Sequence, residues 1–84
     1  MPIIAIVDGV EIKVFWNDHN PPHIHAVLAE HNCCISIVTG AIMSGTLPKA
    51  KFRKVVRWLE DNQTEAMYAW DEAHNSRPYK GKIK

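Results

Sequence analysis

The sequence predicts an α+β fold: a small antiparallel sheet followed by two C-terminal helices that pack on one of its faces. Short β-rich runs fill the first half of the chain, and turn-forming dipeptides separate them. From Pro48 onward, apolar residues recur every three or four positions, which is typical of amphipathic helices. Strands first and helices second are the arrangement of α+β domains.

The composition suits a single domain over residues 1–84. The chain has 84 residues, of which 46% are hydrophobic, enough for one modest core. It contains neither an apolar run of about 18 residues nor the features of a secretory signal, so we expect a cytoplasmic protein without a membrane segment. Cys33 and Cys34 are adjacent and would point to opposite faces of a strand, so we expect no disulfide between them.

The first hairpin is predicted at IIAIV-DG-VEIKVFW. Asp-Gly between two β-rich runs is a strong signal for a two-residue turn. Pairing across this turn places apolar residues opposite one another on one face: Val7 with Val10, Ala5 with Ile12, and Ile3 with Val14.

The second hairpin is predicted at HIHAVLAE-HN-CCISIVT, with His31-Asn32 as its turn. The two hairpins span residues 3–39, and a short strand or a turn is expected between Gly40 and Gly45, with strands extending to about residue 43. The core-side pairs of the second hairpin would be Leu28 with Ile35, Ala26 with Ile37, and Ile24 with Thr39. His23 and His25 would then lie on the face away from the helices.

Two helices are predicted over residues 48–61 and about 63–75. In the first, a stripe with helical spacing faces the core, and Pro48 suits the first turn: Phe52, Val55, Val56 and Leu59. In the second, the inward residues are Ala66, Trp70 and Ala73, with Met67 nearby. A basic tail follows over residues 77–84.

The segment WNDHNPPHIHA carries three of the five histidines. His23 and His25 alternate on a strand and project from one face about 7 Å apart, close enough to converge on one metal ion. His19 precedes them in a loop that Pro21 and Pro22 stiffen. We predict a metal site formed by His19, His23, His25 and Asp18, in which the three histidines are also the candidate catalytic residues.

The expected cofactor is a divalent metal ion, with zinc as the first choice, and a cofactor-free site is the alternative. Bound zinc would favour a hydrolytic reaction such as phosphodiester cleavage. On strand geometry Cys34 lies two pleat repeats from the row of His25, and His31 lies farther along the strand, so neither is expected among the ligands. In the alternative interpretation the histidines are exposed strand and loop residues with no chemistry.

The charge is divided unevenly along the chain. Residues 1–48 hold one base against four acids, a net −3, and residues 49–84 hold nine bases against five acids, a net +4. Lys49, Arg53 and Arg57 on the first predicted helix are candidates for contact with phosphate or nucleic acid. The alternative is an ordinary solvated helix face, and no helix-turn-helix is recognisable.

The chain resembles a family of small bacterial proteins catalogued as a domain of unknown function. The resemblance rests on FWNDHNPPHIH, IVTGAIMSGTLP, VVRWLEDN and Trp70. Its D-H-x-P-P-H-x-H signature is matched here by Asp18, His19, Pro21, Pro22, His23 and His25. The resemblance implies a stand-alone bacterial domain, sometimes linked to toxin-antitoxin-like gene pairs, and implies no particular reaction.

The sequence therefore supports two alternative functions. The first is a metal-binding or catalytic domain built on the histidine cluster. The second is a protein-interaction module without catalysis, such as a toxin-antitoxin-like or regulatory partner, with Trp16, His25 and Trp58 as anchors. The expected partners are the product of a neighbouring gene or a second copy of the chain, because an exposed sheet edge invites pairing.

Overall fold

The computed structural model describes residues 3–15 and 21–74. Along this part of the chain five strands precede two helices. The strands are β1 (Ile3–Val7), β2 (Val10–Lys13), β3 (His23–Leu28), β4 (His31–Ser36) and β5 (Ile42–Gly45), and the helices are α1 (Lys49–Asp61) and α2 (Gln63–His74). This order confirms the predicted α+β fold, including the short strand after Gly40.

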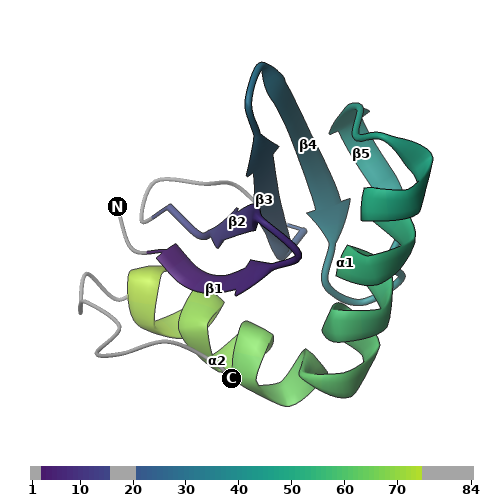
Figure 1. Cartoon of the computed structure of the whole chain (residues 1–84). Coiled ribbons are helices and arrows are strands. Elements are labelled where there is room, and N and C mark those ends of the chain that lie inside the picture. The colour runs from purple at the N-terminus through teal and green to yellow at the C-terminus, as the bar shows by residue number, and fades with distance from the viewer. Residues whose placement is uncertain (1–2, 16–20, 75–84) are drawn as a thin grey trace.

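The strands form one open antiparallel sheet in the order β1-β2-β3-β4-β5, so each strand pairs with its neighbour in sequence (Figure 1). Asp8 and Gly9 have φ values of 49° and 83°, and two successive positive φ values are what the predicted two-residue turn requires. The predicted pairs Val7 with Val10 and Ala5 with Ile12 are present.

The far end of the first hairpin differs from the prediction. Ile3 pairs with Lys13 rather than with Val14, because the β1 ladder is irregular between Ile3 and Ala5. An extra residue in one strand changes which side chains face the core. As a result Ile4 and Ala5, although consecutive, are both buried.

The core lies between the helices and one face of the sheet. Ile12 pairs with Ala26, Ala26 with Cys33, and Ile24 with Ile35, so these fully buried residues share a face. Val55 and Leu59 of α1 belong to the same buried cluster, as do four residues of α2: Ala66, Ala69, Trp70 and Ala73. Of the stripes predicted from the sequence, Val55 and Leu59 of α1 and the three inward residues of α2 are confirmed as core, while Phe52 and Met67 pack partly buried against it and Val56 is only half-buried. Each fully buried isoleucine or valine contributes roughly 1.5–3 kcal/mol to stability.

Polar contacts attach the helices to the hairpins. The Lys51 and Lys54 ammonium groups lie 2.8 and 2.9 Å from Asp8 Oδ2, and together they lower the pKa of Asp8 to about 2. Gln63, at the start of α2, donates from Nε2 to the Ile37 carbonyl at 2.9 Å. The Asn62 side chain donates to the Trp58 carbonyl at 2.9 Å, which caps the end of α1.

Within the described residues, neither helix is long and apolar enough to cross a membrane. The basic tail predicted over residues 77–84 lies outside the described residues, as do Trp16, Asp18 and His19.

Candidate metal centre

The β3–β4 hairpin turns two residues earlier than the sequence suggested. Leu28 pairs with His31, and Ala29 in the turn has a positive φ of 54°. The predicted turn at His31-Asn32 and the pairs derived from it are therefore wrong. In the observed register Ile24 lies opposite Ile35 and both are fully buried, whereas the predicted register would set Ile24 against Thr39. We attribute the earlier turn to this burial of β-branched pairs, which outweighs the local turn preference of Asn32.

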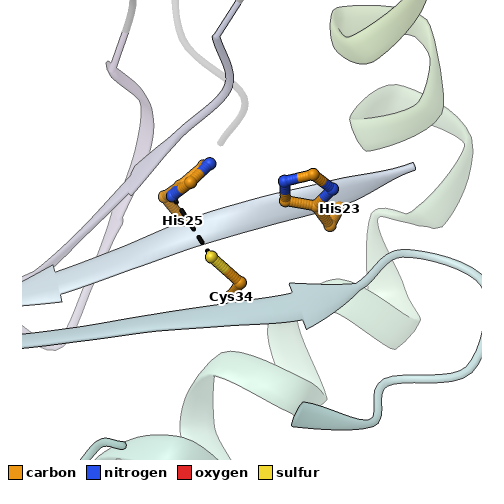
Figure 2. A group of neighbouring side chains, drawn as sticks. All are labelled: His23, His25 and Cys34. Carbon is orange, nitrogen blue, oxygen red and sulfur yellow. Dashed lines mark hydrogen bonds between the residues drawn. The ribbon is translucent and has the colours of Figure 1, made fainter. Parts of the chain in front are cut away.

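The earlier turn brings Cys34 directly opposite His25. The expectation that Cys34 is too distant to join the histidines is thus corrected, because it depended on the wrong register. His23, His25 and Cys34 each offer one ligand atom, and these three atoms all lie within 4.8 Å of one another. Figure 2 shows the cluster, with the two imidazoles projecting from β3 and the thiol from β4.

A direct contact within the cluster joins Cys34 Sγ to His25 Nδ1 at 3.4 Å (Figure 2). Either the thiol donates its proton to the ring, or a protonated Nδ1 donates to the sulfur. In both cases a single proton lies between two atoms that bind zinc well, and a metal ion can replace that proton.

The Pro21 carbonyl orients the ring of His23. His23 Nδ1 lies 2.9 Å from this oxygen, and because a carbonyl can only accept, Nδ1 must carry the hydrogen. In a neutral ring the nitrogen that then acts as acceptor or metal ligand is Nε2. A backbone carbonyl that sets the tautomer in this way is common beside metal-bound histidines.

Aromatic rings hold the two imidazoles from the sides. Phe15 meets His25 edge-on, with ring centroids 4.5 Å apart and planes at 90°. His23 lies 5.1 Å from both His25 and Trp70, measured between ring centroids. Such packing restricts side-chain rotation and so lowers the entropy cost of binding a ligand.

The contact with Trp70 corrects part of the expectation that the histidine face lies away from the helices: the cluster alternates with the core residues that α1 covers, but α2 reaches His23. His23 is the first residue of β3, and its ring reaches Trp70 of α2, so only 8% of the residue is exposed. His25 and Cys34 are half-buried. The cluster is therefore a partly sheltered site rather than a row of solvated strand residues.

Lys13 lies beside the cluster and was not among the predicted site residues. It pairs with His25 across β2 and β3, and Cys34 pairs in turn with Ser44 of β5. The Lys13 ammonium is 3.4 Å from a carboxylate oxygen of Glu11. Strand alternation in the sequence is the signal that could have placed Lys13 on the histidine face. Alternation also placed Cys34 on that face, but only the strand register shows that Cys34 lies opposite His25.

The two adjacent cysteines differ in environment, as expected. Cys33 is fully buried on the core face, and burial raises the pKa of its thiol, as does the nearby Cys34 to a lesser extent. Both thiols are free.

The predicted phosphate-contact residues are exposed on α1. Lys49 and Arg53 face solvent, and Arg57 lies 3.8 Å from Asp61, its neighbour one turn on. Since α1 packs on the core face and the cluster lies on the opposite face, we do not join these bases and the histidines into one site. Phosphate contact by α1 remains a prediction.

The fold and the cluster define a small α+β domain with a sheltered His-His-Cys group on its sheet. A family described as a domain of unknown function (DUF4160) matches residues 9–71, and the chain belongs to this family. This confirms the expected membership in a family of unknown function. No match was found among curated proteins or among solved structures.

Proposed function

We propose that this protein binds a transition-metal ion, with zinc as the first choice, through His23, His25 and Cys34. The observation that carries the proposal is the convergence of three ligand atoms within 4.8 Å on one half-buried patch of the sheet. Two imidazoles and a thiolate suit zinc, copper or cobalt far better than magnesium or calcium, which prefer oxygen ligands.

The spacing of the donors supports this proposal. Ligand atoms around a tetrahedral zinc ion lie about 3.3–3.6 Å apart, given bonds of about 2.0 Å to nitrogen and 2.3 Å to sulfur. The Sγ–Nδ1 distance of 3.4 Å already falls in that range. The other donor pairs lie within 4.8 Å, so binding would draw them closer, and the contacts of His23 with Pro21 and of His25 with Phe15 would orient the rings.

Three protein ligands leave a fourth position in a tetrahedral site. The residues that we propose for it are His19 and Asp18, which precede β3 in the sequence. With water there instead, zinc would supply a hydroxide near neutral pH, so hydrolysis is the reaction class that we assign to a catalytic version of the site.

The test is elemental analysis of tag-free protein after reconstitution with zinc, together with the absorption spectrum of the cobalt-loaded protein. We expect one equivalent of metal and a thiolate-to-cobalt charge-transfer band. Cys34→Ala should abolish the band, and a His23→Ala/His25→Ala variant should lose the metal. Cys33→Ala is the matched control, because the Cys33 thiol faces the core. This variant should retain both the bound metal and the charge-transfer band.

Circular dichroism must first show that each variant is folded. A folded wild-type protein that takes up no metal would refute the proposal, and so would a charge-transfer band that survives in Cys34→Ala. His19→Ala and Asp18→Ala measured in the same series would reveal the fourth ligand through a weaker affinity for zinc.

A further inference from the structure

The β4–β5 hairpin exposes an unusual amount of apolar surface. Val38, Ile42 and Met43 are 62%, 47% and 42% exposed, and we call these three residues the hairpin patch. Every residue of β5 is exposed, although the strand pairs with β4 along one side. A strand of this composition is expected to be covered on at least one face.

The hairpin patch also lacks charge. Residues 31–48 contain no Asp, Glu, Lys or Arg, although such residues make up 23% of the chain. Soluble proteins usually protect edge strands with charged residues or proline, because an unprotected edge recruits other strands. Residues 42–45 carry neither kind of protection.

The opposite edge of the sheet provides a contrast. β1 is the other edge strand of the sheet. The pairing of β1 with β2 and that of β5 with β4 each contain an irregularity, so a bulge does not distinguish the two edges. β1, however, is followed at once by Asp8, which Lys51 and Lys54 tie to α1. That edge therefore carries charge and a helix contact, whereas β5 presents uncharged apolar residues to solvent.

We propose that the hairpin patch is the contact surface of a homodimer in which β5 of one copy lies antiparallel to β5 of the other. A two-fold axis sets the same patch against itself, so the surface must be self-complementary. An apolar surface without charge meets this condition, because it brings no like charges together. The strand is short, so we expect a modest, concentration-dependent association rather than an obligate dimer.

The experiment is light scattering or sedimentation of the full chain over a wide range of protein concentration, with chelator present to separate dimerisation from metal binding. We expect the mass to rise toward twice the 9.6 kDa of one chain. Ile42→Lys and Met43→Lys should each raise the dissociation constant at least about tenfold, because lysine desolvates poorly and repels its symmetry mate. Concentration-dependent NMR shifts should fall within residues 38–45.

Ile6→Lys is the matched control, because Ile6 lies on the other edge strand and is 54% exposed. It should leave the dimer intact. A chain that stays monomeric throughout would overturn the proposal, as would a dimer that survives both patch variants or one that Ile6→Lys disrupts equally. Association restricted to another protein, with no self-association, would also overturn it.

Discussion

At the scale of single residues, Cys33 and Cys34 have the same chemistry and opposite surroundings. Neighbouring strand residues point to opposite faces, so Cys33 joins the core while Cys34 faces His25. The thiolate is the reactive form, and burial both raises the pKa of Cys33 and blocks access to it.

Alkylation of the native protein should therefore label Cys34 at least about tenfold faster than Cys33. Peptide mass spectrometry after timed treatment with iodoacetamide measures both rates. In denaturant the two rates should become similar, and added zinc should protect Cys34 in the native protein. Equal native rates would contradict the burial difference between the two thiols.

Glycine is required at Gly45 for two separate reasons. Its φ of +77° disfavours any side chain, and a Cβ there would collide with the Asn32 carbonyl oxygen of β4. Gly9 has a similar φ of +83°, but a Cβ added to Gly9 would meet no other atom within 4 Å.

Gly9→Ala should consequently cost about 1–2 kcal/mol of unfolding free energy through its φ alone. Gly45→Ala should cost more, about 2–4 kcal/mol, because β5 must also shift away from β4. Urea denaturation of the two variants separates the contributions, and equal losses would show that the predicted collision has no effect.

At the scale of elements, Asp8 connects the first hairpin to α1. Its carboxylate accepts from Lys51 and Lys54, which lowers its pKa from 3.8 to about 2 in the folded protein. A lowered pKa means that the charged form stabilises the fold. This stabilisation is fully present above about pH 4 and is lost as the pH falls toward 2.

Asp8→Asn should lower the urea midpoint modestly at pH 7, and the difference from wild type should shrink as the pH falls toward 2. Asparagine tolerates the positive φ of this turn position, so the variant removes the charge and keeps the turn. The groups are exposed, so salt should also reduce the difference. A difference that persists unchanged to pH 2 would exclude the ion pairs as its cause.

At the scale of the whole molecule, one core joins the sheet to both helices, and the candidate metal centre lies on its boundary at Trp70. A ligand that binds the folded chain alone stabilises all of it by mass action. At free zinc 100-fold above the dissociation constant, stability should rise by about 2.7 kcal/mol, or roughly 10–20 °C in melting temperature for a domain of this size.

Thermal melts with and without zinc measure this effect, and chelator should reverse it. Cys33→Ala should lower the melting temperature because it opens a small cavity in the core, yet it should keep the zinc-dependent increase. Cys34→Ala should leave the melting temperature of the zinc-free protein nearly unchanged and should lose the zinc-dependent increase. An equal increase in both variants would place zinc somewhere other than the cluster.

Local sequence patterns predict the first turn, the buried residues of the helices and the face on which the histidines lie. Asp8-Gly9 specified the first turn, the spacing of Val55 and Leu59 specified the buried stripe of α1, and alternation placed His23 and His25 on one face. Each of these features depends on neighbours within a few residues, where steric and hydrogen-bonding preferences are strong. The loop residues Asp18 and His19 remain predicted ligands.

The tertiary structure decided which strand residues meet. The turn at Ala29 and the pairing of His25 with Cys34 both follow from the register that buries Ile24 and Ile35 together, and the contact of His23 with Trp70 follows from the packing of α2. Strand alternation is the same in either register, so the sequence places Cys34 on the histidine face but does not give its distance from His25. Core packing sets that distance, and with it the composition of the candidate metal centre.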